Sequence, residues 1–510
     1  MAAGMTGSGS TEPAAVAETH VSVVLFVGDR VYKVKKPVDF GFLDFRTREA
    51  REAVCRREVE LNRRLAPDVY LGVVDLVGPD GTPFDHLVVM RRMPSGRRLS
   101  TLVTAGRDVR MELRAIAQVL ADFHARADVS AEIAEAGSVH HLRRHWEANS
   151  DQLRAFAVPT PDGPPLLDPG TVEEVAVLAE RYLAGRSPLF ARRITEGRIR
   201  DGHGDVLADD IFCLPDGPRI LDCIEFDDRL RYGDVLGDVA FLAMDLERLG
   251  SPRLGTELLR RYRELTNETY PATLEHFWIA YRAQVRAKVA GLRSGQGDRS
   301  AGVEAHHLLT MTLAHLKRCQ VKLVLIGGAP GTGKSTLAKA LAARQGWALV
   351  RSDEVRKALF GLTTTSRSGA QNGIGEGIYD QASTDATYDE MLARARPDLE
   401  QGQSVVLDAS WTDARFRSAA ATLASDTSSD LIELCCEAPI EVTLARIETR
   451  ADRGDDPSDA TADVAQTLRA ASSPWPSATV IDTGGGRDDS VAQVWAALGP
   501  DILRAETDET

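Results

Sequence analysis

The sequence predicts two folded domains, an α+β domain followed by an α/β domain whose parallel sheet is flanked by helices. Three observations predict this arrangement. A chain of 510 residues is too long for one hydrophobic core, because a domain takes about 150 residues. Strand-like runs fill the segment from Val21 to about Met93, and helical periodicity replaces them from Met111 onward. A new apolar strand begins at Val321 and leads into a glycine-rich loop and a helix.

The boundary between the two domains is expected near residue 318. The stretch SGQGDRSAG at 294–302 has no periodicity, and a short helix-like run separates it from the strand at Val321. We therefore expect the first domain over 18–318 and the second over 319–500. The two ends, 1–17 and 501–510, are small, polar and aperiodic, so we expect both to be flexible.

Composition and charge restrict the class of protein. The chain is 43% hydrophobic and 27% charged, as in ordinary soluble proteins. Its net charge of −14 opposes binding to nucleic acid backbones and anionic membranes. No stretch approaches the roughly 18 apolar residues that span a bilayer, and the N-terminus lacks the pattern of a secretory signal. The cysteines form no C-x-x-C pair, as expected of reduced thiols. We expect a cytoplasmic protein with no membrane partner.

The strongest functional signal is the run VKLVLIGGAPGTGKSTLAKALAA. Residues Gly328 to Ser335 match G-x-x-x-x-G-K-[ST] between an apolar strand and a helix, the context that a phosphate-binding loop requires. Backbone N–H groups of such a loop surround a phosphate, Lys334 neutralises β and γ oxygens, and the Ser335 hydroxyl can ligate Mg²⁺. The predicted nucleotide-binding residues are Gly328, Ala329, Pro330, Gly331, Thr332, Gly333, Lys334, Ser335 and Thr336.

Two acids follow apolar strands in the same domain. Asp353 follows WALVRS, and Asp408 ends SVVLD. In a parallel sheet both would lie at the carboxyl edge, where ligands bind. There an acid can hold the water shell of Mg²⁺ or accept a hydroxyl proton, and Arg356 can reach the same ligand as Asp353. Each acid alone could equally be a helix N-cap.

A later helical stretch, EVTLARIETRADRGDD, places Arg446 and Arg450 on one face. Arginines on a lid can stabilise a transferring phosphoryl group, although a solvated face paired with nearby acids gives the same pattern. With these arginines, residues 319 to about 490 resemble the P-loop kinases that include zeta toxins, gluconate kinases and polynucleotide kinases. The resemblance implies that Asp353 orients or deprotonates the acceptor hydroxyl with Arg356 beside it, and that residues 361–398 form the acceptor side. Asp408 is the candidate magnesium ligand.

The first domain carries its own cluster of carboxylates in RIRDGHGDVLADDIFCLPDGPRILDCIEFDD. His203-Gly204-Asp205 ends an alternating segment, and Asp210 follows five residues after Asp205. Two strands, IFCL and RILDCIEF, are then joined by a PDGP turn. Carboxylates at both ends of a hairpin suit phosphoryl transfer, in which one accepts the hydroxyl proton and others hold Mg²⁺.

A buried ion pair is predicted upstream of this hairpin. In REAREAVCRREVELNRRLA, Glu58 interrupts an apolar stripe that includes Val54 and Leu61, so its carboxylate needs a cation. The preceding strand VYKVKK offers Lys33 and Lys35, of which we favour Lys33. Such a pair can position nucleotide phosphates, or it can be a purely structural ion pair.

Residues 20 to about 290 resemble aminoglycoside phosphotransferases and choline-kinase-like enzymes on these motifs. The resemblance implies a bilobal protein-kinase-like domain in which Asp205 is the catalytic base and Asp238 is structural. It also implies that the pair of Lys33 and Glu58 positions the nucleotide phosphates.

The metal ligands of this site are predicted from the same resemblance. Aligning the second strand of the hairpin by its length selects Glu225, with Asp222 as the second choice. Asp210 stands where the family carries Asn, which keeps an oxygen ligand and adds a charge. No G-x-G-x-x-G loop precedes Lys33. Both departures put the activity of this site in doubt.

Together these patterns predict a phosphotransferase with two kinase-type domains. Each would use ATP (or GTP) and Mg²⁺ to phosphorylate a hydroxyl of a small molecule, with the P-loop site as the main one. Two alternatives stay open: the first domain binds substrate or regulates, or the whole chain is a nucleotide-dependent switch. A nucleotide or an oligonucleotide end stays open as the acceptor, although the net charge argues against nucleic acid as a partner. The sequence does not specify the acceptor or the oligomeric state.

Overall fold

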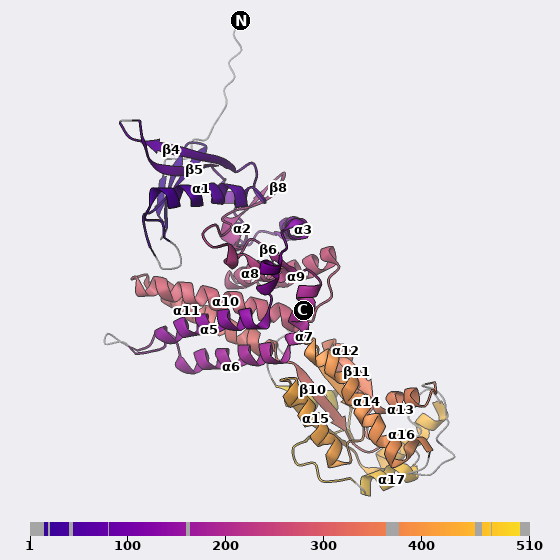
Figure 1. Ribbon diagram of the computed structural model, residues 1–510. Coiled ribbons are helices and arrows are strands. Elements are labelled where there is room, and N and C mark those ends of the chain that lie inside the picture. Colours follow the sequence, from indigo (N-terminus) through magenta and orange to yellow (C-terminus); the bar gives the residue numbers. More distant parts are fainter. Residues whose placement is uncertain are drawn as a thin grey trace. The chain divides into compact units, whose positions relative to one another are not determined.

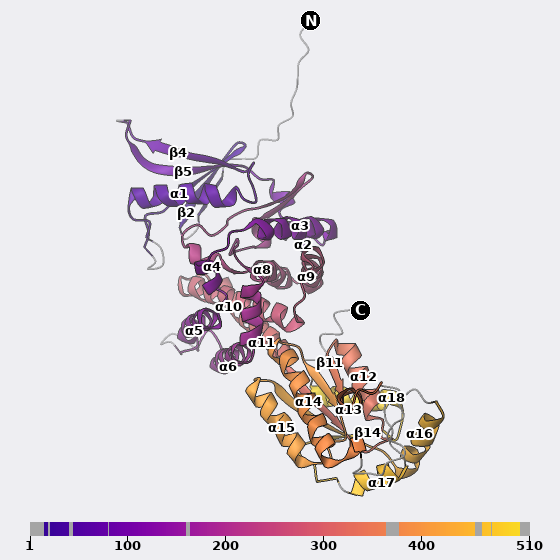
Figure 2. The same cartoon turned by 45° about the vertical axis from the view of Figure 1, so that its right-hand side comes forward.

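The computed structural model describes residues 15–18, 21–39, 44–79, 81–159, 164–363, 377–453, 462–470 and 472–499, and the side chains of 450–453 and 462–464 are left out. The chain forms two compact units (Figures 1 and 2). The first unit contains Met1–Leu142, Arg193–Thr269 and Tyr281–Arg286; the second contains Arg143–Arg192, Tyr270–Ala280 and Ala287–Thr510. The predicted domain limits at 318 and 319 stay a prediction. The predicted flexible ends lie outside the described residues except for 15–17, which belong to strand β1.

The first unit begins with an antiparallel sheet in the order β1-β2-β3-β5-β4. Its strands are β1 (Ala15–Glu18), β2 (Ser22–Val27), β3 (Arg30–Lys35), β4 (Tyr70–Val77) and β5 (Pro83–Arg91). Helix α1 (Arg48–Asn62) begins at the N-cap Thr47, whose hydroxyl accepts from Ala50 N at 3.2 Å. The helix packs on the sheet through a buried cluster that includes Cys55, Val59 and Val88. This packing places Glu58, one residue from Val59, next to the inner face of β3.

The rest of the first unit is mainly helical, and it carries short hairpin strands (Figure 1). Its elements are α2 (Leu99–Thr104), α3 (Arg110–Arg126), α4 (Ala131–Glu135), β6 (Ile199–Asp201), β7 (Ile211–Leu214), β8 (Gly217–Ile220), β9 (Tyr232–Asp234), α8 (Val235–Arg248) and α9 (Pro252–Thr266). Helix α8 is buried from Val235 through Leu246, so it forms the centre of this part. A sheet lobe with one helix followed by a helical lobe is the predicted bilobal, protein-kinase-like fold, which is confirmed.

The second unit contains a parallel sheet in the order β11-β12-β10-β13-β14. Its strands are β10 (Lys322–Gly327), β11 (Ala348–Arg351), β12 (Val405–Asp408), β13 (Asp430–Glu437) and β14 (Thr479–Asp482). The helices around it are α12 (Lys334–Gln345), α13 (Ser352–Leu359), α14 (Gln381–Glu400), α15 (Ala414–Asp426), α16 (Ile440–Arg453), α17 (Ala462–Ala470) and α18 (Arg487–Leu498). This confirms the predicted α/β fold.

Alternation along β10 explains why helices cover both faces of this sheet. Leu323 and Leu325 belong to one buried cluster, whereas Val324 and Ile326 belong to another on the opposite face. A central parallel strand therefore needs apolar residues at successive positions, as LVLIG at 323–327 supplies. The pairing Ile326 with Asp408 places the end of β12 beside the loop that follows β10.

Further helices of the second unit are α6 (Pro169–Gly185) and α11 (Arg299–Arg318), together with parts of α5 (Val139–Phe156), α7 (Ser187–Thr195) and α10 (Ala272–Gly295). The buried side chain of Arg186 joins them to the sheet region. Its Nη1 donates to Leu399 O at 2.6 Å and to Thr427 O at 2.9 Å. A search of the described helices for one with the length and hydropathy of a bilayer-spanning segment finds none.

Candidate active sites

The phosphate-binding loop joins β10 to α12 and depends on its glycines. Gly328, Gly331 and Gly333 have φ of +131°, +85° and +88°. A Cβ at Gly328 would lie 2.5 Å from Cys436 O, and one at Gly331 would lie 2.6 Å from Thr443 O. Backbone oxygens cannot turn away, so both positions require glycine for space as well as for conformation. The motif therefore folds as the strand, loop and helix that the sequence predicts.

A cavity of about 670 Å³ lies over this loop. Its lining includes Gly331, Gly333, Lys334, Ser335, Thr336 and Arg446. Lys334 is the first residue of α12, where the helix N-terminus favours an anion. Arg446 Nη2 donates to Thr483 O at 2.7 Å, while its buried Nη1 has no hydrogen-bond partner within the described residues. The cavity thus combines a helix N-terminus, a lysine and an arginine donor that is available to an anion.

Asp408 lies at the carboxyl end of β12, beside the loop. Arg351 Nε donates to Asp408 Oδ2 at 3.1 Å. The other oxygen, Oδ1, is buried and has no hydrogen-bond partner in the described part of the chain. A buried carboxylate oxygen left in this state can accept from a metal-bound water, so Asp408 and the Ser335 hydroxyl fit Mg²⁺.

The donor set at this site suits a magnesium ion that is shared with phosphates. Among the described residues no group of three or more His, Cys, Asp or Glu side chains could hold a metal ion. Mg²⁺ at phosphate sites takes one or two protein ligands and keeps several waters, so it needs no such group.

Asp353 and Arg356 lie on α13, which follows β11. Asp353 is the second residue of the helix and is partly exposed. Arg356 Nη1 donates to Ile378 O at 2.8 Å and to Thr384 Oγ1 at 3.3 Å, and its guanidinium lies 4.9 Å from the centre of the Tyr379 ring. Arg356 therefore ties α13 to the start of α14.

The acceptor side of this domain is described only in part. Residues 364–376 of the predicted acceptor segment lie outside the described residues, as does the side chain of Arg450. The roles of Asp353, Arg356, Arg446 and Arg450 in the reaction stay predictions.

In the first unit, Glu58 lies between two lysines. Its Oε1 is 2.9 Å from Lys33 Nζ, and its Oε2 is 2.7 Å from Lys35 Nζ. Lys33 and Lys35 are two residues apart on β3, so they point to the same face. Burial opposes the ionisation of Glu58, but the two ammonium groups outweigh it, and the pKa of Glu58 is lowered. The predicted pair of Lys33 and Glu58 is present, and Lys35 completes it.

Asp222 and Glu225 have different surroundings. Lys33 Nζ lies 2.8 Å from Asp222 Oδ1, and Lys35 binds Glu225. The side chain of Asp222 is 48% exposed, whereas that of Glu225 is 8% exposed. The expected strand RILDCIEF in fact ends at Ile220, and Asp222 takes a left-handed conformation with φ of +64°. An alignment by strand length therefore could not place these acids. The metal role of Glu225 stays a prediction.

The loop that carries Asp205 is held by buried polar groups. Asp238 accepts from the backbone N–H groups of His203 at 2.6 Å and Gly204 at 3.0 Å. Burial lowers the pKa of His203 to about 4, so its ring is neutral. Its Nε2 donates to Leu221 O at 3.1 Å, and its Nδ1 accepts from Asp205 N at 3.3 Å. Asp205 is therefore fixed at the end of a rigid turn.

Burial and neighbouring acids raise the pKa of two acids at this loop, Asp205 and Asp210. Burial, together with the charge of Asp222, raises the pKa of Asp205 to about 6. Burial and the charges of Asp222 and Asp205 raise the pKa of Asp210 well above its usual range. A carboxylate with a pKa near neutrality is suited to accept a hydroxyl proton, and closely spaced acids attract a divalent cation.

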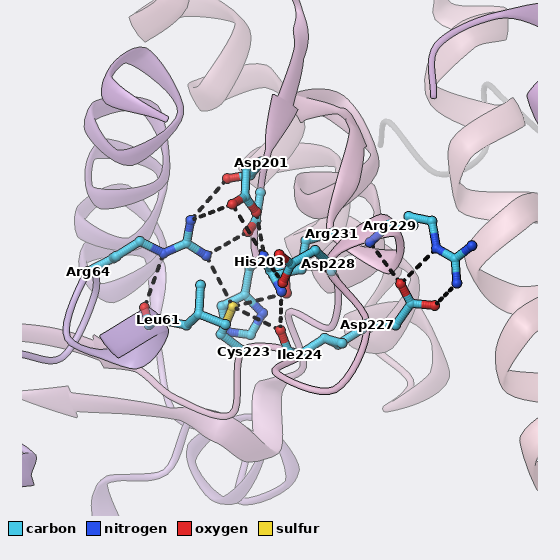
Figure 3. Close-up of polar contacts among 12 residues, drawn as sticks. Leu61, Arg64, Asp201, His203, Cys223, Ile224, Asp227, Asp228, Arg229 and Arg231 are labelled. Carbon is cyan, nitrogen blue, oxygen red and sulfur yellow. Dashed lines mark hydrogen bonds and ion pairs between the residues drawn. The ribbon is translucent and has the colours of Figure 1, made fainter. Parts of the chain in front are cut away.

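Two arginines that the sequence reasoning missed connect the elements of this site (Figure 3). Arg64, just beyond α1, donates to the carbonyl oxygens of Asp201 at 3.2 Å and Gly202 at 2.9 Å, and its Nη2 lies 3.2 Å from Cys223 Sγ. Arg231 Nε donates to Asp201 Oδ1 at 2.7 Å. These contacts link the helix of Glu58 to the segments before Asp205 and after Asp222. Charged residues at a helix end usually face solvent, so the pattern gave no signal.

Comparison with known proteins finds relatives of this chain in mycobacteria. It is 44% identical to the uncharacterized protein Rv2004c of Mycobacterium tuberculosis (strain H37Rv) over 482 residues, 94% of each chain, and equally to an uncharacterized protein of Mycobacterium bovis. The chain belongs to their family. Because the alignment covers 94% of each chain, these family members extend over both units.

A family model and several solved structures match parts of this chain. Residues 323–474 match the family model described as AAA domain. A choline/ethanolamine kinase family protein from Mesorhizobium loti is 17% identical, with a TM-score of 0.38, over 61% of this chain and 94% of that chain. A gluconokinase from Sinorhizobium meliloti 1021 is 15% identical, with a TM-score of 0.25, over 37% of this chain and 95% of that chain. The two kinase-type folds themselves follow from the element order and contacts described above.

Proposed function

We propose that the protein is a kinase that transfers the γ-phosphoryl group of ATP (or GTP) to a hydroxyl of a small molecule, with the P-loop site as the main catalytic site. The observation that carries this proposal is the cavity over the loop. The N-terminus of α12, Lys334 and the available donor of Arg446 line it, and the unpartnered oxygen of Asp408 lies at the neighbouring strand end. These groups are suited to a nucleotide triphosphate with Mg²⁺.

Each residue of this site would have a separate role in phosphoryl transfer. Lys334 and Arg446 would neutralise the charge that spreads over the phosphoryl oxygens, which is the main protein contribution in this chemistry. The Ser335 hydroxyl and Asp408 would hold Mg²⁺, which bridges the phosphates. Asp353, at the start of α13 on the same sheet edge, would orient the acceptor hydroxyl and accept its proton. The acceptor itself, the cytoplasmic location and the choice between ATP and GTP are part of the proposal.

We further propose that the first unit holds a second nucleotide site. Asp205 would accept the hydroxyl proton, and Lys33, held by Glu58, would bind nucleotide phosphates. Asp222 is the better candidate for the metal than Glu225, because it is exposed beside Lys33 whereas Glu225 is buried against Lys35. Asp210 would be a further oxygen ligand. The alternative is a unit that binds substrate or regulates the P-loop site, and nucleotide affinity without turnover would support it.

The test compares variants of the full chain. Lys334→Ala removes a positioned cation, so we expect the ATP turnover of the P-loop site to fall roughly 10²-fold or more. The matched control is Lys339→Ala, which removes an exposed lysine from the same helix and should leave turnover unchanged. Unchanged turnover in Lys334→Ala would refute the P-loop proposal. ATP consumption that depends on an added hydroxyl compound, screened over sugars, aminoglycosides, nucleosides and oligonucleotide 5′ ends, separates an enzyme from a nucleotide-dependent switch.

A further inference from the structure

Two arginines of α10, Arg282 and Arg286, lie one helical turn apart in the part of the helix that belongs to the first unit. Arg282 contacts both the loop of Asp205 and the start of α8. Its Nη1 donates to Gly204 O at 3.0 Å and its Nε to Gly237 O at 3.1 Å. Its Nη2 lies 3.5 Å from Asp238 Oδ1. Arg282 therefore holds the catalytic loop and has a structural role.

Arg286 has no such partners. Its Nε is buried, and its guanidinium makes no hydrogen bond or ion pair with any described residue. Among the charges that oppose the effect of burial on the pKa of Asp205, that of Arg286 is the largest. Arg286 lies one helical turn from Arg282, which contacts Gly204, the residue before Asp205, so its guanidinium belongs to the surroundings of this loop. A partly buried cation without a counter-charge costs free energy, which an anionic ligand would recover.

The acids nearby do not supply that counter-charge. Asp245 is engaged by Arg248 Nε at 2.7 Å and by Ala208 N at 2.9 Å. Asp222 is paired with Lys33. Among the described residues, these two acids are thus paired with other groups, whereas the Arg286 guanidinium on α10 has no hydrogen-bond or ion-pair partner.

We propose that Arg286 binds an anionic oxygen of a reactant beside Asp205. Such an oxygen belongs either to the transferring phosphoryl group or to a carboxylate or phosphate on the acceptor. A guanidinium suits both because its N–H groups bind such oxygens in pairs. This inference rests on the proposed nucleotide site of the first unit. It also makes that site a poor match for polycationic acceptors, which would meet an uncompensated like charge.

The experiment uses the full chain with Lys334→Ala, which removes the lysine of the P-loop site and weakens phosphate binding there. Inorganic phosphate is titrated calorimetrically into the chain saturated with Mg²⁺ and ADP. We expect Arg286→Gln to weaken phosphate binding roughly 10-fold or more, the effect of losing a charged hydrogen bond, and Arg286→Lys to restore part of it. Arg114→Gln, which removes an exposed arginine from α3, is the matched control and should bind phosphate normally. Phosphate binding that is equal with and without Arg286 overturns the proposal.

The affinities for Mg²⁺–ATP and Mg²⁺–ADP identify the source of the anion. If Arg286 binds the transferring phosphoryl group, Arg286→Gln weakens ATP and leaves ADP unchanged. If it binds an acid group of the acceptor, both nucleotides bind normally and only phosphate is lost. Should the Arg286-containing parent bind neither nucleotide, the proposed nucleotide site fails and this inference fails with it. Thermal unfolding supplies a check on folding: Arg286→Gln should leave Tm unchanged, whereas Arg282→Gln should lower it.

Discussion

Lys33 Nζ lies 2.8 Å from Asp222 Oδ1, so a phosphate-binding candidate and a metal-binding candidate form an ion pair with each other. The charge of Lys33 lowers the pKa of Asp222, which keeps that carboxylate ionised at neutral pH. Mg²⁺ and nucleotide phosphates can replace the two partners of this ion pair together, because the metal cation neutralises Asp222 while the phosphates neutralise Lys33. The pair therefore holds the site in a charged state before nucleotide binds.

The two acids after β8 should respond differently to neutralisation. Asp222→Asn removes the proposed metal ligand, which is exposed, so we expect the Mg²⁺ dependence of ATP binding by the first unit to weaken roughly 10-fold while Tm changes little. Glu225→Gln instead deprives buried Lys35 of a carboxylate, so we expect a lower Tm. Calorimetric ATP titrations at several Mg²⁺ concentrations, made in the Lys334→Ala chain, measure the first effect. If Glu225→Gln weakened the Mg²⁺ dependence and Asp222→Asn lowered Tm instead, Glu225 would be the better candidate for the metal ligand.

Asp210 should couple metal binding to proton release. Burial and the charges of Asp222 and Asp205 raise the pKa of Asp210, so this carboxyl binds a proton more tightly than an ordinary aspartate, and bound Mg²⁺ would favour the release of that proton. Asp210→Asn cannot release that proton. We expect it to lower the proton release and the metal dependence of ATP binding while phosphoryl transfer is kept or increased. Titrations of Mg²⁺–ATP in two buffers of different ionisation enthalpy give the number of protons. Equal release by both chains would contradict the assignment.

The sequence predicted the backbone of both sites better than their electrostatics. Gly328, Gly331 and Lys334 lie in a motif whose spacing dictates a loop, and the structure places them accordingly. The pair of Lys33 and Glu58 could be predicted from the sequence, because an acid interrupted an apolar stripe. The exposed position of Asp222 could not be predicted, since it depends on the early end of β8 and on the left-handed conformation of Asp222 itself.

Contacts between residues far apart in the chain could not be predicted from the sequence either. In the sequence, Arg64 is an ordinary charged residue at a helix end, and Arg286 is an ordinary charged residue within a helix. Their neighbours are supplied by segments more than 75 residues away in the chain, as with Arg64 and the carbonyl of Asp201. Periodicity shows which face of a helix is buried, but not which loop it meets.

At the P-loop site, Asp353 and Asp408 should have separable roles. Asp353→Asn should leave ATP affinity nearly intact and slow transfer to the acceptor, because the residue is assigned to the hydroxyl. Asp408→Asn should weaken the Mg²⁺ dependence, and it also removes the charge of one of the two carboxylates that Arg351 contacts, the other being Glu354, so its Tm must be recorded. Titrating ATP and Mg²⁺ against both variants tests the division. Identical or exchanged phenotypes would refute it.

The raised pKa of Asp205 predicts a pH dependence of both activity and stability. As the proposed base, Asp205 must be ionised, so transfer by the first unit should fall as the pH drops through about 6. For stability the sign is opposite. The folded chain holds this proton more tightly than the unfolded chain, so ionisation of Asp205 destabilises the fold as the pH rises from the ordinary value of 3.8 to about 6. Asp205→Asn removes that cost.

We therefore expect Asp205→Asn to abolish transfer by the first unit and yet to raise its free energy of unfolding at pH 7.5 by on the order of 2 kcal/mol. The gain should shrink as the pH falls through about 6 and should vanish only below the ordinary value of 3.8, where Asp205 is protonated in both the folded and the unfolded chain. Urea unfolding of both chains at pH 5.0 and 7.5 measures the difference. Asp209→Asn, which changes an exposed acid in the same loop, is the control. A variant that is less stable than the parent at pH 7.5 would show that Asp205 is not held at a raised pKa.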